Sequence, residues 1–299
     1  MKKEILIVVG VYAREKNEPT SAAFASGLTN LMTADANVTV TYIDNIQIVI
    51  DNDSFELYDA ATGRPFSDFD LITMHGRLRT HREIAYAVSR YCQYRDIPHF
   101  NDYSVYYPGS KVGQAVAFLE AGVRIPKTLY ALDGDRLLAL AEKELEAPFI
   151  LKHINGTKGK SNYLVQNIKE ARERLAAEPD VPFMAQAYCP NDRDYRVLVT
   201  PTRELVFERR GGADTHLNNT SQGAAAALAP AAVPPQVIAQ ARAVAKALGL
   251  TLGGVDVMRH LDTGEFYFIE INSQPQLFTG ALLDEKNVFA HQLILDLLA

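Results

Sequence analysis

Short apolar runs alternate with amphipathic stretches through the first hundred residues of the chain. Four runs have the length and composition of strands, at residues 4–11, 38–43, 71–75 and 98–101. Two stretches have the apolar spacing of helices, at residues 21–33 and 80–96. Strands that alternate with helices in this way predict a parallel α/β layer. Residues 47–58, followed by a Thr-Gly-Arg-Pro turn at 62–65, predict a small hairpin inserted into the layer.

The pattern changes after a loop rich in Tyr, Pro and Gly at residues 103–110. Helices are then predicted at residues 111–121, 135–143, 169–177 and 235–248, and strands at 127–132, 149–153 and 162–166. The chain beyond residue 182 is otherwise rich in strands. We therefore expect a mixed α/β and α+β fold in three domains: an N-terminal α/β domain (1–105), a central domain (106–182) and a C-terminal α+β domain (183–299).

The composition is that of a globular protein, with 299 residues of which 47% are hydrophobic and 22% charged. The formal net charge of −6 argues against a general binder of nucleic acid or of membrane surfaces, which would need a basic face. Cys92 and Cys189 are too few for a disulfide framework or a four-thiolate metal site. No apolar stretch reaches the roughly 18 residues that span a bilayer. The apolar run at residues 5–9 is too short for a secretory signal, so a cytoplasmic protein is expected.

A lysine at the end of a predicted buried strand, Lys152, precedes a loop that contains glycine. The loop includes Gly156, Thr157, Lys158 and Gly159. Backbone donors in a flexible loop beside a lysine suit the binding of phosphates. The segment is not a Walker A loop, because Ile154 stands where that motif needs glycine and because a strand follows. It predicts a lid between two antiparallel strands that closes over a triphosphate, the alternative being an exposed basic hairpin.

Two further groups of polar residues lie on predicted strands. Glu270 and Asn272 are two residues apart, so their side chains share one strand face. With Asp256 on a neighbouring strand they offer an all-oxygen site suited to Mg²⁺, the alternative being a solvent-facing edge strand.

The other group is the pair Asp194 and Arg196, again on one strand face, followed by the Glu-Arg-Arg segment at residues 208–210 that contains Arg209. Arginines gathered in this way can hold carboxylates and phosphates in bidentate geometry. The alternative is that these arginines are solvated or paired with carboxylates.

Together these groups resemble the ATP-grasp superfamily, and within it the RimK-type carboxylate–amine ligases. The resemblance covers roughly residues 105–280 and implies an ATP-grasp fold behind a parallel α/β (pre-ATP-grasp) domain. It places Lys111 and Lys152 at the nucleotide phosphates and residues 156–159 in the lid. The hinge that binds adenine corresponds to Gln186, Ala187 and Tyr188.

The resemblance also implies roles around the sugar, the metal and the substrates. Asp194 matches an acidic residue that binds ribose, and Arg196 an arginine that faces the reacting phosphoryl group. Asn219 aligns with an asparagine on the nucleotide and metal side, and an amine would attack near Arg209. The metal triad corresponds to Asp256, Glu270 and Asn272.

The chain departs from the family pattern at four places. Ala187 stands where the hinge usually has glutamate, so backbone groups of its two neighbours must serve the adenine. Ser110 replaces an aspartate before the first lysine, and Leu217 replaces an arginine near the γ-phosphate. Ser-Gln-Pro-Gln at residues 273–276 replaces the usual Ser-Pro-Gly after the metal residues. ATP use is expected despite these changes, which bear mainly on the acceptor.

The resemblance implies an ATP-dependent ligase, which activates a carboxylate as an acyl phosphate, joins it to an amine, and releases ADP and phosphate. Lys111, Lys152 and Arg196 would clamp the phosphate oxygens. Magnesium, expected as two ions and with Mn²⁺ as an alternative, would neutralise the transferred charge. Two alternatives stay open, a phosphotransferase of the same fold acting on a small hydroxyl substrate and a non-catalytic nucleotide-binding module.

The expected partners are a carboxylate and an amine, each a small molecule or a peptide. Nucleic acid and membranes are not expected as partners, and a homo-oligomer is left open. Arg77 follows a predicted N-terminal strand at its carboxyl end, where open α/β sheets bind ligands. It is therefore a candidate for binding substrate, the alternative being an ordinary loop arginine.

Overall fold

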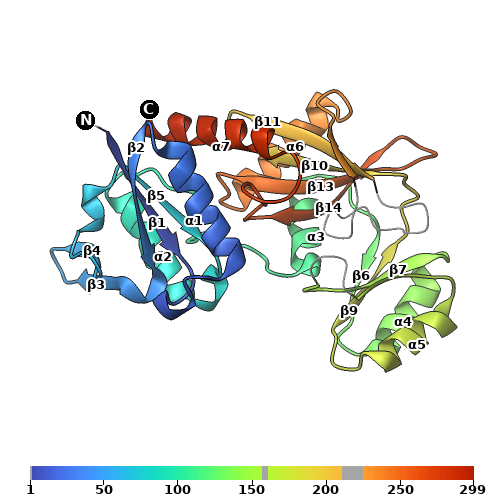
Figure 1. Ribbon diagram of the computed structural model, residues 1–299. Helices are drawn as coiled ribbons and strands as arrows, with labels where there is room; N and C mark the ends of the chain where they lie inside the picture. Colours follow the sequence, from blue (N-terminus) through green and yellow to red (C-terminus); the bar gives the residue numbers. More distant parts are fainter. Residues whose placement is uncertain (1, 157–160, 211–224) are drawn as a thin grey trace.

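A computed structural model of the protein describes residues 2–156, 161–210 and 225–299. Three parts, each built on a sheet, follow one another along the chain, as the change of colour in Figure 1 shows. The N-terminal part lies at one end of the molecule and a small central part lies at the other (Figure 1). The C-terminal sheet lies between them, which confirms the mixed α/β and α+β fold expected from the sequence.

The N-terminal part is built on a three-stranded parallel sheet. Its strands, in the order β2-β1-β5, are β1 (Lys3–Val9), β2 (Ala36–Tyr42) and β5 (Leu71–His75). Alternate residues of β1 join two cores: Ile7 packs with α1 (Pro19–Met32), and Val8 packs with α2 (Arg82–Tyr94). Helices thus cover both faces of the sheet, which explains why β1 is apolar throughout.

The predictions for the connections of this part had different outcomes. The hairpin is confirmed, because β3 (Ile46–Ile50) pairs antiparallel with β4 (Phe55–Asp59). The strand expected at residues 98–101 is wrong, since the segment forms an isolated bridge between His99 and Ile72 instead. The backbone turns at Asn101, where φ is +51°, and the Asn101 side chain binds backbone groups of Leu252 and Ser273 in the C-terminal part. Short 3-10 turns span Ala13–Glu15, Ile43–Asn45, Phe66–Asp68 and Leu78–Thr80.

The central part is a four-stranded antiparallel sheet with two helices. Its strands, in the order β6-β9-β7-β8, are β6 (Thr128–Leu129), β7 (Phe149–His153), β8 (Asn162–Val165) and β9 (Phe183–Ala187). The helices are α4 (Gly134–Glu144) and α5 (Ile168–Ala177), whose buried residues share one core with the sheet. Since β9 pairs with β6 and β7, we place the end of this part after β9, five residues beyond the position expected from the sequence.

The C-terminal part is a five-stranded antiparallel sheet in the order β12-β11-β10-β13-β14. Its strands are β10 (Asp194–Val199), β11 (Glu204–Arg210), β12 (Ala225–Leu228), β13 (Gly253–Arg259) and β14 (Phe266–Asn272). One face packs against α6 (Pro235–Ala247) and α3 (Lys111–Glu120), through residues such as Ile238 and Phe118.

The helix α7 (Leu283–Leu298) joins the C-terminal sheet to the N-terminal part. Figure 1 shows α7 running from the C-terminal sheet toward α1. One core contains Phe289 and Leu293 of α7, Phe207 of β11 and Phe24 of α1. This shared core fixes the N-terminal layer against the sheet that carries the candidate site.

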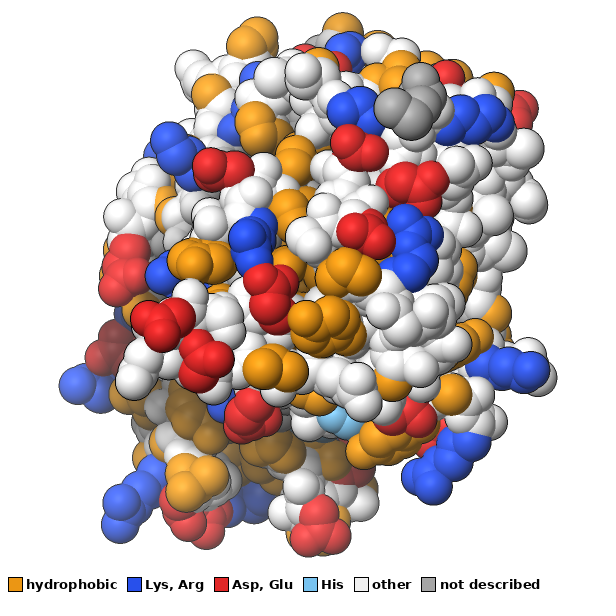
Figure 2. All heavy atoms as spheres, turned by 90° about the vertical axis from the view of Figure 1, so that its left-hand side faces the viewer, with side chains coloured by type: hydrophobic (Ala, Val, Ile, Leu, Met, Phe, Trp, Pro, Cys, Tyr) orange, Lys and Arg blue, Asp and Glu red, His pale blue; other side chains and the backbone are white. Residues whose placement is uncertain are grey.

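The surface of the N-terminal part carries Lys and Arg interspersed with Asp and Glu and with hydrophobic side chains (Figure 2). Among the hydrophobic side chains that are exposed are Val49 and Ile50 of β3. None of the helices in the described ranges combines the length and the hydropathy needed to cross a membrane.

Candidate functional site

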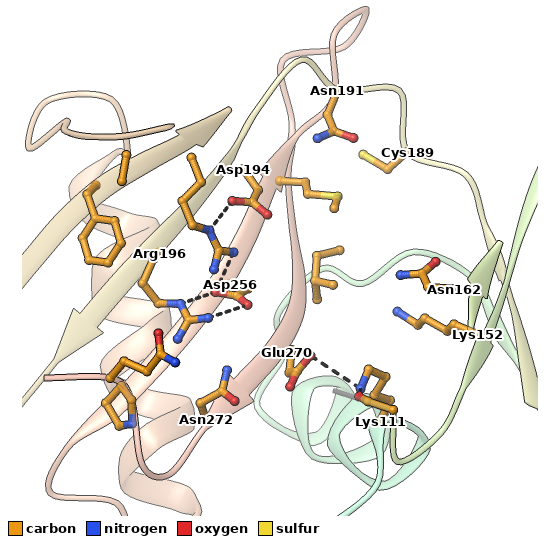
Figure 3. Close-up of a pocket in the computed structure, with 18 of the residues that line it drawn as sticks. Lys111, Lys152, Asn162, Cys189, Asn191, Asp194, Arg196, Asp256, Glu270 and Asn272 are labelled. Carbon is orange, nitrogen blue, oxygen red and sulfur yellow. Dashed lines mark hydrogen bonds and ion pairs between the residues drawn. The ribbon is translucent and has the colours of Figure 1, made fainter. Parts of the chain in front are cut away.

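A cavity of about 530 Å³ lies where the central sheet, α3 and the C-terminal sheet meet. Its walls come from β7, β9, β10, β11, β13 and β14, and from the start of α3 (Figure 3). Five cationic side chains line it, namely Lys111, Lys152, Arg196, Arg209 and Lys286. Three carboxylates line it, namely Asp194, Asp256 and Glu270. Among the described residues the cavity thus has more cations than anions.

Two lysines from different elements meet on one side of the cavity (Figure 3). Lys111 is the first residue of α3, whose N-cap Ser110 accepts a hydrogen bond from the Gly113 N–H at 3.2 Å. The Lys111 Nζ donates to the Gly156 carbonyl at 2.5 Å and lies 3.6 Å from the Glu270 carboxylate. Lys152 ends the pairing of β7 with β8 and is only 5% exposed. Ser110, which stands where the family usually has aspartate, is thus a good N-cap for the helix that begins at Lys111.

The Lys152 ammonium is buried with a neutral partner. Its Nζ donates to Gln186 Oε1 at 2.7 Å, and Gln186 Nε2 donates to Thr128 Oγ1 at 2.8 Å. Burial, together with the nearby charge of Lys111, lowers the pKa of Lys152 to about 8. A desolvated cation of this kind gains free energy when an anion binds beside it.

The predicted adenine hinge lines the cavity next to this pair of lysines. Gln186, Ala187 and Tyr188 all border the cavity, as does Cys189. The Ala187 N–H donates to the Lys127 carbonyl at 2.8 Å, so it is part of the hydrogen bonding of the sheet.

Burial raises the pKa of the Cys189 thiol to about 11 and that of Cys92 to about 12, so both thiols are protonated and unreactive at neutral pH.

Two carboxylates and two arginines form a network on the opposite wall, in which Asp194 and Arg209 are buried (Figure 3). Asp194 faces Arg209 across β10 and β11, and Arg196 faces Asp256 across β10 and β13. Arg209 lies 2.6 Å from Asp194 Oδ1 and 3.1 Å from Asp256 Oδ1. Arg196 Nη2 donates to Asp256 Oδ2 at 3.0 Å, and Arg196 Nε also contacts Asp256. Burial raises the pKa of Asp194 to about 6, although Arg209 opposes this.

The predicted metal ligands lie together on β13 and β14. Asp256 pairs with Glu270 across the two strands, and Glu270 and Asn272 both line the cavity. Within the described residues, no group of three or more His, Cys, Asp or Glu side chains could hold a metal. Two carboxylates and an amide oxygen nevertheless fit Mg²⁺, which takes one or two protein carboxylates and completes its shell with water and substrate phosphates.

The remaining predicted residues divide into three groups. Gly156 lines the cavity, whereas Thr157, Lys158, Gly159 and Asn219 lie outside the described residues. Arg77 is not brought to the cavity, because its side chain is 64% exposed and lies 3.7 Å from Glu15.

Sequence reasoning missed Thr20 of α1 and Lys286 of α7, which extend the cavity toward the N-terminal part. The Lys286 Nζ donates to the carbonyls of Gln276 and Thr279, at 2.9 and 2.5 Å. A signal for Lys286 existed, since it shares the buried face of α7 with Phe289 and Ala290, three and four residues away.

Comparison with known proteins places this geometry in a family. The RimK-like ATP-grasp domain matches residues 111–294. A probable alpha-L-glutamate ligase of Marinomonas sp. (strain MWYL1) is 30% identical over 165 residues, which is 52% of each chain. A probable alpha-L-glutamate ligase 2 of Shewanella amazonensis (strain ATCC BAA-1098 / SB2B) is 30% identical over 159 residues, again 52% of each chain. The chain thus spans about half the length of the curated relatives it matches.

Two solved structures share the whole fold. The Chryseobacterium gregarium RiPP-associated ATP-grasp ligase, in complex with ADP and a leader and core peptide, has a TM-score of 0.66 at 15% identity, covering 98% of this chain and 97% of that one. The ATP-grasp ligase PsnB, complexed with a phosphomimetic variant of its minimal precursor, Mg and ADP, has a TM-score of 0.72 at 14% identity and full coverage of both chains. The fold expected from the sequence is confirmed, and the chain belongs to the RimK-like ATP-grasp family.

Proposed function

We propose that the protein is an ATP-dependent carboxylate–amine ligase, which forms an amide bond through an acyl phosphate and releases ADP and phosphate. The observation that carries the proposal is the arrangement of one cavity. Lys111 and Lys152 lie on one side of it, and Asp256 and Asn272 lie on the other, with Glu270 between them (Figure 3). Phosphoryl transfer requires cationic side chains that bind the phosphates and, facing them, oxygen ligands that bind Mg²⁺. The cavity has both.

Each wall has a distinct role in this proposal. Lys111 and Lys152 hold the phosphate oxygens, and Arg196 stabilises the charge on the phosphoryl group as it passes to the carboxylate. Asp256, Glu270 and Asn272 hold Mg²⁺, as two ions, with Mn²⁺ as an alternative. When bound, Mg²⁺ would neutralise the charge that develops on the transferred phosphoryl group.

The roles of the other residues follow from their surroundings. Gln186, Ala187 and Tyr188 border the adenine, and Asp194 borders the ribose. Gly156 lines the cavity, and the resemblance assigns Thr157, Lys158 and Gly159 to a loop over the phosphates and Asn219 to the metal side. The amine attacks near Arg209, whose two ion pairs also hold Asp194 and Asp256 in place.

The substrates enter beyond Arg196, where Thr20, Gln274 and Lys286 extend the cavity. Relatives named alpha-L-glutamate ligases and structural neighbours complexed with peptides support an amino acid or a peptide as the source of the carboxylate and the amine. The excess of cations in the cavity suits a substrate that brings a carboxylate.

The test is ADP release with ATP and Mg²⁺ against mixtures of amino acids and dipeptides, with mass spectrometry of the products. A ligase releases ADP and phosphate over many turnovers only when a carboxylate and an amine are both present, and hydroxylamine in place of the amine gives a hydroxamate. A stable phosphate ester formed on a hydroxyl substrate, over many turnovers and without an amine, would identify a phosphotransferase instead. Nucleotide binding without any turnover across the panel would identify a binding module.

A further inference from the structure

The strand that carries two of the metal ligands, β14, lies at the edge of the five-stranded sheet. Glu270 and Asn272 flank Ile271, which is fully buried. The N–H and C=O of Ile271 point away from β13 and would have no strand to pair with. A buried edge of this kind must be satisfied by other groups.

At Ile271 this edge is satisfied by Gln114 of α3, together with Tyr107 from the loop before the helix. The Ile271 N–H donates to Gln114 Oε1 at 3.0 Å, and Gln114 Nε2 donates to the Ile271 carbonyl at 3.1 Å. Tyr107 Oη donates to the same carbonyl at 2.5 Å and accepts from Gln114 Nε2 at 3.2 Å. Gln114 is only 4% exposed, so its amide takes the place of a neighbouring strand at one residue.

The position of this contact matters because the register of β14 changes beside it. Asp256 pairs with Glu270, but the next residue of β13, Val257, pairs with Phe268, which leaves Ile269 as a bulge. Side chains on a strand alternate between faces, so a shift of one residue at a bulge reverses the face to which the following residues point. Gln114 binds the backbone directly after the bulge, between the two side chains that must face the cavity.

The same helix also contacts the phosphate side of the site. Lys111 precedes Gln114 by three residues, so both side chains lie on one face of α3. Lys111 reaches Glu270 at 3.6 Å and the Gly156 carbonyl at 2.5 Å. The start of α3 therefore holds both the strand of the metal ligands and the residue that leads into the glycine loop.

We propose that Gln114 is a positioning residue for the metal site: its amide fixes the backbone of Ile271 and so holds Glu270 and Asn272 toward the bound cation. The inference rests on the proposed function, which makes those two residues Mg²⁺ ligands. Gln114 does not touch the metal or the nucleotide. Its effect is on the affinity for Mg²⁺, and not on the binding of ADP alone.

The test compares Gln114→Met, Tyr107→Phe and Gln93→Met with the unchanged protein. Gln93 is the control, because its amide is bound to side chains of the segment before α3, Asp102 and Ser104, and not to the backbone of β14. ADP binding is measured by calorimetry at increasing Mg²⁺, and hydrogen exchange is followed in residues 266–274. Neither measurement depends on turnover.

We expect the half-saturating Mg²⁺ concentration to rise about tenfold in Gln114→Met and about threefold in Tyr107→Phe, as for other residues that orient metal ligands. It should stay within about twofold in Gln93→Met, since this change leaves β14 untouched. Exchange at residues 266–274 should quicken most in Gln114→Met, less in Tyr107→Phe and not in Gln93→Met, and ADP binding without Mg²⁺ should be the same in all variants.

A Mg²⁺ requirement in Gln114→Met equal to that of the unchanged protein would overturn the inference while leaving the proposed function intact. If Gln114→Met does not fold, Tyr107→Phe decides in the same way. Binding of ADP by the unchanged protein that is indifferent to Mg²⁺ would instead refute the metal site, and with it the inference.

Discussion

Replacement of Lys152 by methionine tests whether the cavity is built around a desolvated cation. Lys152 is 5% exposed, and its Nζ donates to the neutral Gln186 at 2.7 Å. Burial lowers the pKa of Lys152 from 10.5 to about 8, which means that the folded protein holds this proton less tightly than the unfolded chain does. Methionine keeps most of the packing of the side chain and removes its charge.

The magnitude follows from the pKa difference. A shift from 10.5 to about 8 corresponds to about 3 kcal/mol by which the charged lysine destabilises the folded state at neutral pH. The variant leaves Gln186 Oε1 without its donor, which costs about 1–3 kcal/mol. The free energy of unfolding without nucleotide should therefore be equal to that of the wild type or up to about 2 kcal/mol higher.

The pH dependence isolates the charge from the lost hydrogen bond. Between pH 8 and pH 10.5 the unfolded chain binds more protons than the folded protein, so wild-type stability rises with pH in this window. Relative to Lys152→Met, the wild type should gain about 2 kcal/mol between about pH 7 and about pH 9.5. Urea unfolding at both pH values measures this difference.

A control variant and the comparison of pH profiles decide whether Lys152 is a desolvated cation. Lys143→Met, at a lysine that is 78% exposed, is the matched control and should follow the wild-type pH profile. Parallel profiles for Lys152→Met and the wild type would show that Lys152 keeps its ordinary titration and would refute the argument. At ADP–Mg²⁺ about 100 times above its dissociation constant, the wild type should gain about 2.7 kcal/mol and Lys152→Met much less.

Three further outcomes are expected. Glu270→Gln should fold and should lose ADP formation by orders of magnitude. The control Glu265→Gln, at a side chain that is 39% exposed and paired with Arg124, should change ADP formation little. More than about a tenth of wild-type turnover in Glu270→Gln would contradict the metal role. Arg209→Met should lower the free energy of unfolding by about 3–5 kcal/mol in urea at neutral pH, because it leaves Asp194 with an unpaired buried charge. That loss should shrink as pH falls toward about 6, the pKa of Asp194 with Arg209 in place, because without Arg209 the carboxyl takes up its proton at a higher pH; a loss independent of pH would contradict this.

Local pattern was sufficient for most of the elements and for several of the residues that line the cavity. The segment around Lys152 is a short apolar run, and the structure has β7 at Phe149–His153, the residues predicted. Glu270 and Asn272 could be paired in advance because a strand repeats every two residues. Elements whose pattern lies within about ten residues are the ones that sequence specifies most directly.

Long-range contacts account for what the sequence did not reveal. Residues 98–101 have strand composition, but Asn101 turns to bind the C-terminal part about 150 residues away in the chain. Gln274 lies where the family usually has proline, and its amide binds both backbone groups of Gly76, at 3.0 and 3.1 Å. Gln114 likewise reads as an ordinary helix residue until β14 is placed beside it. Each of these side chains acts on a partner that no local pattern identifies.

The net charge of the whole chain and the charge around the cavity have opposite signs. The whole chain has a formal net charge of −6, which by itself would disfavour a polyanionic ligand such as a nucleoside triphosphate. The described residues around the cavity, however, include five Lys or Arg side chains and three carboxylates. Charges farther apart than about 8 Å are largely screened at physiological ionic strength, so a ligand in the cavity responds to the local excess of cations. The surface carboxylates set the behaviour of the chain toward other macromolecules, and the buried cations select the ligand.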